Sequence, residues 1–285
     1  MKALIIGKSG QLAHELIDEK PNDAEVLCVG RSDVDICSVE SLDKVIAKFS
    51  PSVIINASAY TAVDKAESDE NAAYAINQHA VENIAKLANK YNIRLIHVST
   101  DFVFDGQQSK AYLVDDNTNP CSVYGTSKLA GEQGIQSHCP KNSVIVRTSW
   151  LYSSYGNNFV KTMLRLMQEK PELGVVCDQI GCPTSANSLA KFLWKLAKRQ
   201  SIEPMYHWSD YGVASWYDFA VAIQNIAFDE GLLKEKIPVK PIPASSYPTP
   251  AKRPNFSLLN ASESYLIEPS AHWSVQLEQC ISKLS

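Results

Sequence analysis

The amino-terminal stretch of the chain combines a short buried strand, a glycine turn and the start of a helix. Residues 2–6 (KALII) form an almost wholly apolar run, which is typical of a strand buried on both faces of a parallel sheet. Gly7, Gly10 and Ala13 follow at three-residue spacing, and an apolar helical pattern continues after them. This order predicts a dinucleotide-binding unit, in which Gly7 allows the tight turn and Gly10 lets backbone amides approach a pyrophosphate. The spacing differs from G-x-G-x-x-G, and a plain strand–helix turn is the alternative.

Four more apolar runs occur before residue 150, with helical patterns between them. They cover residues 25–29, 53–55, 94–98 and 143–147. This alternation predicts an α/β fold with a Rossmann-type, doubly wound parallel sheet, which we assign to an NAD(P)-binding domain over residues 1–150. A long amphipathic helix is predicted over residues 73–91. After Trp150 the pattern changes. We assign residues 151–285 to a smaller C-terminal substrate-binding domain, with some segments packing back on the first domain.

A tyrosine and a lysine lie four residues apart in a stretch that is typical of the first turns of a helix. Residues at i and i+4 share a helix face, so Tyr124 and Lys128 are expected to point the same way. A nearby cation favours the phenolate and lowers the tyrosine pKa, and such a tyrosine can give a proton to a carbonyl oxygen as hydride arrives at the carbon. We therefore take both as candidate catalytic residues. One such pair is also expected by chance in a chain of this length, and a surface helix with an ordinary lysine is the alternative.

Small and polar residues follow the third and fourth predicted strands, at the sheet edge where ligands bind in open α/β folds. Residues 56–60 (NASAY) are small enough for a ligand to pass close to the chain. Thr100 and Asp101 follow the fourth strand, and Thr100 offers a hydroxyl to a substrate oxygen. Residues 102–104 continue without a helical pattern, which favours this function over helix capping. His97 lies within the strand and is interpreted as a core histidine, not a catalyst.

The cation after the second predicted strand bears on the choice of cofactor. Arginine at this place suits the 2′-phosphate of NADP, whereas an acidic residue binds the ribose 2′-hydroxyl of NAD. Arg31 stands there, and Asp33 and Asp35 follow closely, so the residues leave both cofactors open. Two further cations, Lys252 and Arg253, lie in a proline-rich run that predicts an extended loop, and they suit a diphosphate. For all three cations a solvated loop charge is the alternative.

Composition limits the partners and the compartment. A net charge of −4 gives no reason to expect nucleic acid or an anionic membrane as a partner. The apolar run before Gly7 is too short for a signal sequence or a membrane span. The seven cysteines are odd in number and show no C-x-x-C pair, which predicts buried thiols of a reducing compartment. We therefore expect a cytoplasmic protein.

Taken in order, these motifs resemble an extended short-chain dehydrogenase/reductase of the dTDP-4-dehydrorhamnose reductase type. The resemblance runs the whole length and is carried by residues 7–12 (GKSGQL), 56–67 (NASAYTAVDKAE), 99–106 (STDFVFDG), 123–132 (VYGTSKLAGE), 147–150 (RTSW), 158–164 (NFVKTML), 178–184 (DQIGCPT) and 247–254 (YPTPAKRP). It implies reduction of the 4-keto group of dTDP-4-dehydro-6-deoxy-L-mannose to dTDP-L-rhamnose, a precursor of cell-surface polysaccharide. NADPH, or NADH, would supply the hydride.

The resemblance also implies functions for single residues. Tyr124 is the general acid, Lys128 lowers its pKa and binds the nicotinamide ribose, and Thr100 hydrogen-bonds the sugar or the tyrosine. The implied cofactor-binding residues are Gly7, Gly10, Gln11, Leu12, Arg31, Asp35, Ile36, Ala57, Ser58, Ala59, Tyr124 and Lys128. The implied substrate-binding residues are Thr100, Asp101, Trp150, Lys252 and Arg253.

The chain departs from the family pattern in several places. Ser58 and Phe102 stand where alanine and tyrosine are expected, and the second change removes one hydroxyl from the pocket. Glu15 matches a position at which some bacterial members are thought to hold magnesium between two subunits, but Asn187 stands where a second glutamate is expected. A neutral amide is a poor ligand for Mg²⁺. We therefore expect no metal, and a monomer or a metal-independent homodimer.

Two alternatives to this function remain open from the sequence. The first is a non-enzymatic regulatory subunit of the methionine adenosyltransferase type, which keeps the fold and acts by binding. The second is a different sugar-nucleotide reductase or epimerase.

Overall fold

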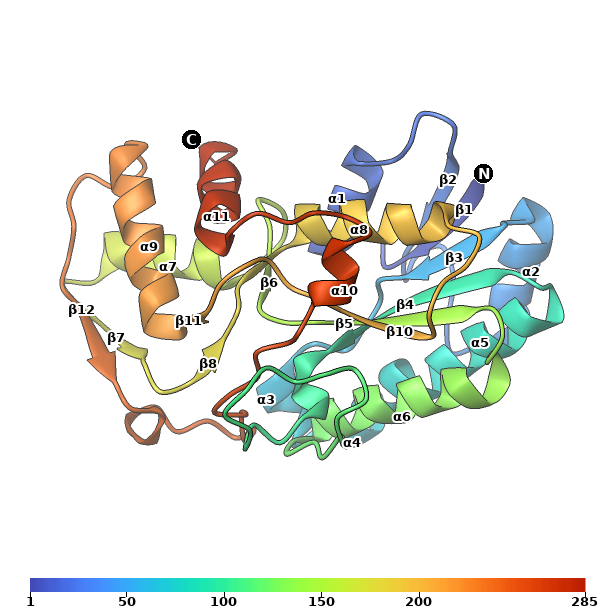
Figure 1. Ribbon diagram of the computed structural model, residues 1–285, viewed down its shortest axis with the longest axis horizontal. Helices are drawn as coiled ribbons and strands as arrows, with labels where there is room; N and C mark the ends of the chain where they lie inside the picture. The colour runs from blue at the N-terminus through green and yellow to red at the C-terminus, as the bar shows by residue number, and fades with distance from the viewer. Residues whose placement is uncertain (285) are drawn as a thin grey trace.

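A six-stranded parallel sheet forms the centre of the computed structural model, which describes residues 1–284 (Figure 1). Across the sheet the strands are β2 (Glu25–Val29), β1 (Lys2–Ile6), β3 (Val53–Asn56), β4 (Arg94–Thr100), β5 (Ser143–Thr148) and β10 (Met205–Trp208). Every adjacent pair is parallel. The chain runs outward from β1 in both directions, so the strand order reverses between β1 and β3. The predicted doubly wound sheet is confirmed, and ligands bind at such a reversal point in open α/β sheets.

Side chains of the sheet are buried on both faces. Successive side chains of a strand point to opposite faces, and in β1 Ala3 and Ile5 join one apolar cluster while Leu4 and Ile6 join another. The first cluster contains α1 (Gln11–Asp18) and α8 (Ala186–Lys198). The second contains α2 (Val39–Phe49), α5 (Ala80–Lys90) and α6 (Val123–His138). These helices form the two outer layers of the fold (Figure 1).

The long helix predicted over residues 73–91 is interrupted in the structure. α4 (Glu70–Tyr74) runs into a π-helical turn, η1 (Ala75–His79), before α5 begins. Asn77 accounts for the interruption, because its buried amide bonds the backbone of Tyr60 and donates to Ser127 Oγ at 3.0 Å. A Cβ atom at Gly131 would lie 2.1 Å from the Asn77 carbonyl oxygen, so α6 packs this closely on the turn only with glycine there. Apolar periodicity does not reveal such a turn.

Beyond residue 150 the chain forms small sheets and a further group of helices. β6 (Leu151–Tyr152) pairs with β9 (Thr184–Ser185), β7 (Leu173–Val176) with β12 (Val239–Ile242), and β8 (Ile180–Gly181) with β11 (Ala214–Ser215). Helices α7 (Phe159–Glu169), α9 (Trp216–Asp229) and α11 (Trp273–Ser282) enclose an apolar cluster of their own. In contrast, β10 is a strand of the central sheet, and α8 belongs to the helical layer that covers it. The domain division at residue 150 stays a prediction.

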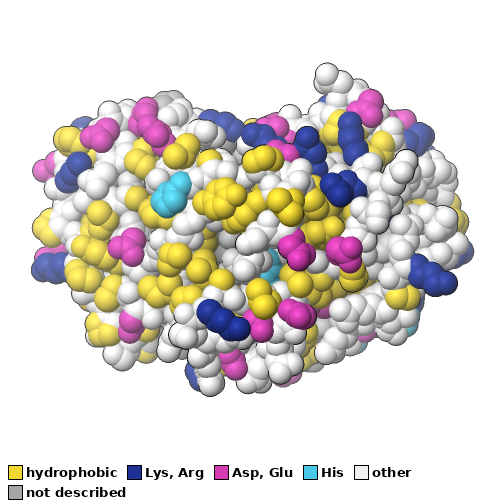
Figure 2. All heavy atoms as spheres, viewed as in Figure 1, with side chains coloured by type: hydrophobic (Ala, Val, Ile, Leu, Met, Phe, Trp, Pro, Cys, Tyr) yellow, Lys and Arg dark blue, Asp and Glu magenta, His cyan; other side chains and the backbone are white. Residues whose placement is uncertain are grey.

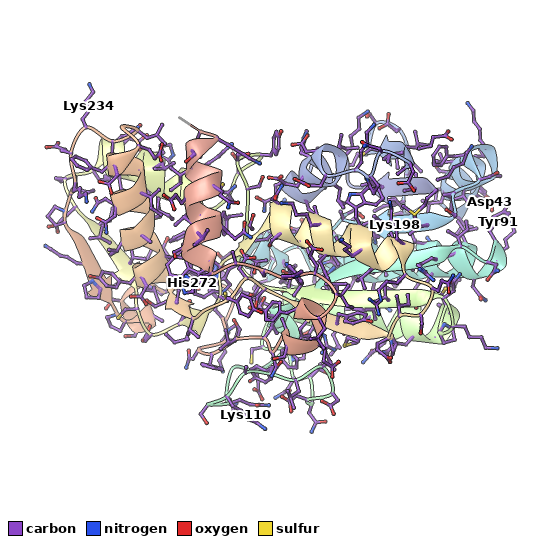
Figure 3. All side chains as sticks on the ribbon, turned by 45° about the horizontal axis from the view of Figure 1, so that its top comes forward. Asp43, Tyr91, Lys110, Lys198, Lys234 and His272 are labelled. Atoms are coloured by element: carbon purple, nitrogen blue, oxygen red, sulfur yellow. The ribbon has the colours of Figure 1, made fainter. Side chains whose placement is uncertain are left out.

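The remaining elements are short: α3 (Val63–Ala66), η2 (Asp101–Val103), η3 (Ala244–Ser246) and α10 (Ser262–Tyr265). The proline-rich run, expected as an extended loop, contributes strand β12, where Pro241 is tolerated because the strand has a partner on one side only. The molecule is elongated, with Lys234 at one end and Asp43 and Tyr91 at the other (Figure 3). On the face shown in Figure 2, acidic and basic side chains are interspersed.

Two sequence-based expectations concern the chain as a whole. All seven cysteines are free thiols, as the odd number and the spacing predicted. The expectation that they are buried is wrong for four of them, because only Cys139, Cys182 and Cys280 are buried. Within residues 1–284, no helix combines the length and the apolar character needed to cross a bilayer.

Candidate active site

A large cavity opens at the carboxyl edge of the central sheet. It has a volume of about 880 Å³ and is bounded by the ends of β1, β3, β4 and β5, the start of α6 and the start of α9. It brings together almost all of the predicted site residues, namely Gly7, Gly10, Gln11, Leu12, Arg31, Asp35, Ile36, Ala57, Ser58, Ala59, Thr100, Asp101, Tyr124, Lys128, Trp150 and Arg253. Lys252 is the exception.

One wall of the cavity consists mainly of backbone and small side chains. Gly7 has a φ of +121°, and a Cβ atom there would lie 2.9 Å from the carbonyl carbon of Ala57. The position therefore requires glycine. Gly10 is the N-cap residue of α1, and no side chain caps this helix. An uncapped helix N-terminus that lines a cavity favours an anionic group, because its first N–H groups have no intrahelical acceptor.

The charged residues after β2 lie at the edge of this wall. The Asp33 carboxylate accepts a hydrogen bond from Gly30 N at 2.9 Å and lies 3.4 Å from Lys8 Nζ. The Asp35 carboxylate accepts from Cys37 N at 2.9 Å. Arg31 is exposed and has no hydrogen-bond or ion-pair partner within residues 1–284. Both carboxylates thus accept hydrogen bonds from the backbone of the turn, whereas the Arg31 guanidinium is unpaired among the described residues.

The opposite wall carries buried polar side chains from β4 and α6. Ser122 Oγ accepts a hydrogen bond from Gly125 N at 3.2 Å and so starts α6. A buried ion pair of 2.7 Å between Arg147 and Glu132 holds this helix against β5. Tyr124 and Lys128 then lie in the first turns of α6, as predicted, with exposures of 9% and 1%.

Burial sets the pKa values of this pair. Burial raises the pKa of Tyr124 to about 12, with a hydrogen bond from Thr100 acting to lower it. Burial lowers the pKa of Lys128 to about 8. Lys128 Nζ donates to the Val98 carbonyl oxygen at 2.7 Å and lies 3.2 Å from His97 Nε2. The pKa of Tyr124 is therefore raised and not lowered, contrary to the expectation from its spacing to Lys128, because burial penalises the phenolate.

Thr100 and Asp101 stand beside the tyrosine. Thr100 Oγ1 donates to Asp101 Oδ1 at 3.0 Å and accepts from Phe102 N at 3.2 Å, which starts η2. Thr100 therefore does cap a short helical turn, contrary to the sequence-based expectation, and also lines the cavity. Asp101 Oδ2 is buried and has no hydrogen-bond partner within the described chain. Burial raises the pKa of Asp101 to about 6, although hydrogen bonds from Ser257 and Thr100 act in the opposite direction.

An aromatic stack closes the cavity toward the C-terminal elements. Trp150 has a φ of +47°, which is unusual for a bulky residue and costs conformational energy. Its ring stacks on Trp216 with centroids 3.6 Å apart and planes 9° apart. Gly181 lies against the indole, since a Cβ atom there would be 2.8 Å from Trp150 Cε2. The sequence indicated Trp150 but not Trp216. Trp216 also lines the cavity, where it stacks on a residue 66 positions away in the sequence.

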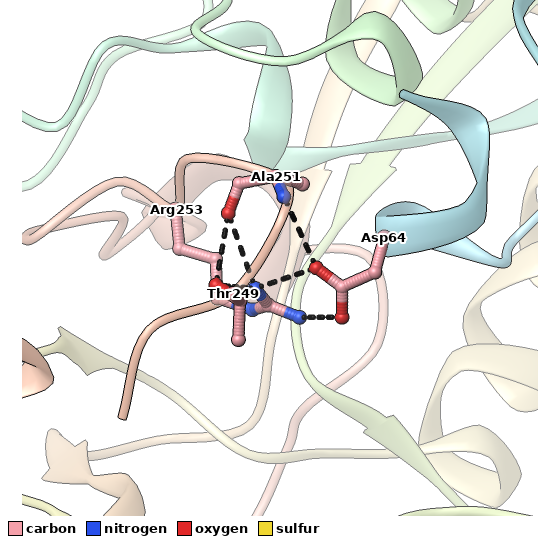
Figure 4. A network of polar contacts seen from close by, with 4 residues as sticks. All are labelled: Asp64, Thr249, Ala251 and Arg253. Carbon is pink, nitrogen blue, oxygen red and sulfur yellow. Dashed lines mark hydrogen bonds and ion pairs between the residues drawn. The ribbon is translucent and has the colours of Figure 1, made fainter. Parts of the chain in front are cut away.

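The two predicted cations of the proline-rich run separate in the structure. Arg253 lines the cavity and forms a two-pronged ion pair with Asp64 at 3.0 and 2.7 Å, which ties the run to α3 (Figure 4). Ala251 N also donates to Asp64, at 3.2 Å. Lys252 is exposed and does not line the cavity. Only Arg253 of the two is thus placed at the cavity, and a contact of Lys252 with the diphosphate stays a prediction.

The sequence model of one family, described as the RmlD substrate binding domain, matches residues 1–285. The chain belongs to the dTDP-4-dehydrorhamnose reductase family. A reductase of that name from Sinorhizobium fredii is 41% identical over an alignment of 269 residues, which covers 92% of this chain and 90% of the relative. The crystal structure of a dTDP-4-dehydrorhamnose reductase from Clostridium acetobutylicum has a TM-score of 0.93 and 38% identity, covering 100% of this chain and 99% of that one. The corresponding protein from Bacillus anthracis, in complex with NADP, has a TM-score of 0.93 and 35% identity, covering 99% of both chains.

Membership of the reductase family raises the question of the magnesium position at Glu15. Glu15 is 2% exposed, and its two oxygens accept from Ser153 Oγ at 2.6 Å and from Asn187 Nδ2 at 3.0 Å. The same Asn187 nitrogen donates to Glu19 Oε1 at 2.8 Å. Each Glu15 oxygen therefore already accepts a hydrogen bond from a neutral side chain of this chain. Across residues 1–284, no group of three or more His, Cys, Asp or Glu side chains is placed to hold a metal ion.

Proposed function

We propose that the protein is an NADPH-dependent reductase that converts dTDP-4-dehydro-6-deoxy-L-mannose to dTDP-L-rhamnose. The observation that carries the proposal is the single cavity in which Thr100, Asp101, Tyr124 and Lys128 face the uncapped start of α1. Such an arrangement places acid–base groups beside a dinucleotide site. The names of the relatives supply the substrate, and NADP is bound in one of the related structures.

The backbone wall fits a dinucleotide. Gly7 and Ala57 leave no side chain in the way, and the N-terminus of α1 suits the pyrophosphate. Arg31 is available for a 2′-phosphate, which favours NADPH over NADH. When bound, the reduced nicotinamide supplies a hydride to the sugar C4 atom.

Tyr124 supplies the proton that completes the reduction. Because its pKa is raised to about 12, the phenol keeps its proton at neutral pH and is present in the acid form. Proton transfer to the sugar O4 atom leaves a phenolate in a buried place. We infer that the positive charge of Lys128, buried in the same helix, favours that phenolate. The contact with Thr100 acts in the same direction, and burial opposes both. This assigns catalytic functions to Tyr124, Lys128 and Thr100.

The sugar nucleotide occupies the side of the cavity near α9. Asp101 Oδ2 lacks a partner, and a sugar hydroxyl would supply the missing donor. The stacked Trp150 and Trp216 line this side of the cavity and offer apolar surface to the sugar ring. Arg253 lies on the same side, where it is placed to contact the diphosphate while Asp64 orients its guanidinium.

A direct assay tests this function against its alternatives. The purified protein is incubated with NADPH and a panel of dTDP- and UDP-linked 4-keto sugars, and both NADPH consumption and the sugar product are followed. We expect stoichiometric oxidation of NADPH with the dTDP-linked 4-keto-6-deoxy sugar and formation of dTDP-L-rhamnose. A regulatory subunit would bind without turnover, and an epimerase would convert sugars without net consumption of NADPH. Either result would overturn the proposal.

We further propose a monomer, or a homodimer that forms without metal, acting in the cytoplasm. The position of Asn187 beside Glu15 supports metal independence, because a neutral amide is a poorer Mg²⁺ ligand than a second carboxylate. The seven free thiols support a reducing compartment.

A further inference from the structure

A row of three buried polar side chains runs from β3 through β4 to α6. Asn56 and His97 are opposite each other in the strand register, and their side chains meet with Asn56 Nδ2 3.0 Å from His97 Nδ1. On the other side of the ring, Lys128 Nζ lies 3.2 Å from His97 Nε2. The exposures of the three residues are 1%, 0% and 1%. Both ring nitrogens of His97 are therefore engaged within the protein.

The orientation of the Asn56 amide is determined by its other contacts. Asn56 Oδ1 accepts hydrogen bonds from Ser58 N at 3.1 Å and from Ser58 Oγ at 2.6 Å. A backbone N–H group can only donate, so the oxygen of the amide must face Ser58. The NH₂ group must then face His97, and it donates to Nδ1.

This orientation selects one tautomer of the histidine. Burial and the charge of Lys128 hold the pKa of His97 well below its usual value, so the ring is neutral and carries one proton. Since Nδ1 accepts a hydrogen bond from Asn56, the proton must be on Nε2. The resulting Nε2–H group is directed at Lys128 Nζ. An ammonium has three donors and no acceptor, so this contact is a hydrogen bond only when the lysine is an uncharged amine.

We propose that His97 is a positioning residue for the reductase, whose Nε2–H group favours the uncharged amine of Lys128 and so sets the alkaline limit of activity. The inference rests on the proposed function, in which the charged form of Lys128 stabilises the Tyr124 phenolate. When the amine forms, Lys128 loses one proton and accepts a hydrogen bond from His97, while it keeps its own hydrogen bond to the Val98 carbonyl.

Other ionisable groups near α6 do not replace this effect. Glu132 acts in the opposite direction by favouring the ammonium, but its carboxylate is already paired with Arg147. Other ionisable residues at α6 include Tyr124 and His138 in the helix itself, Asp101 in η2, Glu67 after α3 and Glu82 in α5. Of the residues that contact the Lys128 nitrogen, only His97 carries a side-chain donor.

The tautomer can be observed directly by nitrogen NMR on protein labelled with ¹⁵N-histidine. His97 is assigned by the signal that disappears in His97→Gln. We expect a neutral ring with the proton on Nε2 and no titration between about pH 5 and pH 8. A proton on Nδ1, or titration of His97 in this range, would overturn the proposal. This readout needs no turnover, so it is independent of whether the proposed reaction is correct.

The effect on Lys128 is tested with the same variant. In His97→Gln the amide can turn its oxygen toward Lys128 and accept from the ammonium. We expect the alkaline limb of kcat/KM, and the lysine ¹³Cε titration that reports Lys128, to move up by about one pH unit or more. Ile96→Val, which removes one buried methyl from the same strand without touching the row, is the control and should leave both unchanged. If neither the alkaline limb of kcat/KM nor the ¹³Cε titration of Lys128 moved in His97→Gln, the proposed effect of His97 on Lys128 would be refuted. A protein with the shifted titration but no reductase activity would refute the proposed function alone.

Discussion

The two walls of the cavity are built in opposite ways. The wall formed by β1, β3 and α1 depends on the absence of side chains, with Gly7 against Ala57 and an uncapped helix start. The wall formed by β4 and α6 depends on buried polar side chains, of which Tyr124, Lys128 and Asp101 all have shifted pKa values. The first wall suits binding of a phosphate-bearing cofactor, whereas the second suits proton transfer. Substitutions on the two walls should therefore affect different kinetic constants.

The largest effect is expected on the polar wall, from Tyr124→Phe. This change removes the acidic proton, and we expect kcat to fall by about 10²–10⁴-fold while the dissociation constant of NADPH stays near its wild-type value. Steady-state kinetics and fluorescence titration with NADPH measure the two quantities.

Tyr206→Phe is the matched control for that variant. It removes a buried hydroxyl that accepts a hydrogen bond from Glu203 N, in β10 and outside the cavity. We expect lower stability by about 1 kcal/mol and an unchanged kcat. If Tyr124→Phe kept half of the wild-type kcat, Tyr124 could not be the general acid.

A smaller effect is expected from Trp216→Ala, which removes one partner of the aromatic stack. A stacked aromatic pair contributes about 0.5–1.5 kcal/mol, so the KM for the sugar nucleotide should rise about three- to tenfold as Trp150 loses its support. The KM for NADPH should not change. Trp194→Phe, which alters an indole between α8 and α1 outside the cavity, is the control. An equal rise in both KM values would place Trp216 outside the sugar site.

A still smaller effect is expected on the backbone wall, from Arg31→Ala. Because the guanidinium is exposed, its pairing with a 2′-phosphate should contribute no more than about 1 kcal/mol. The ratio of kcat/KM for NADPH to that for NADH should fall by up to about fivefold, with kcat unchanged. An unaltered ratio would show that Arg31 does not distinguish the two cofactors.

No effect is expected from removal of divalent cations, which neither wall requires. The Asn187 amide lies between Glu15 and Glu19 and donates to both, so these carboxylates are already compensated. The solution mass, measured by light scattering with Mg²⁺ and with a chelator, should be the same, as should the activity. A dimer that dissociates on chelation would contradict this account of Asn187.

Local sequence patterns predicted the backbone wall and the central sheet. Apolar runs ending in glycine or small residues determine a buried parallel strand and its turn, and these depend on neighbouring residues only. The same holds for the start of α6, which Ser122 caps three residues before Gly125. The interruption at Asn77 was missed because the partners of its amide, Tyr60 and Ser127, lie 17 and 50 residues away in the sequence.

The sequence predicted which residues form the polar wall, but it did not predict how burial shifts their pKa values. The spacing of Tyr124 and Lys128 correctly placed both in the first turns of one helix, yet it could not show that His97 engages the lysine from β4. Burial, which raises one pKa and lowers the other, arises from tertiary packing and not from spacing. Trp216 and the Asp64 partner of Arg253 were missed for the same reason, since each contact joins distant segments.

The pH dependence of kcat/KM tests most directly whether the buried polar wall performs the chemistry. The pKa of Asp101 is raised to about 6, so its carboxylate forms only above that pH, and kcat/KM should rise through about 6. The pKa of Lys128 is lowered to about 8, so its charge is lost above that pH, and kcat/KM should fall through about 8. The account predicts a bell-shaped profile with these limbs, whose acid limb is absent in Asp101→Asn. A profile that is flat across this range, or that falls only near the usual lysine pKa, would contradict it.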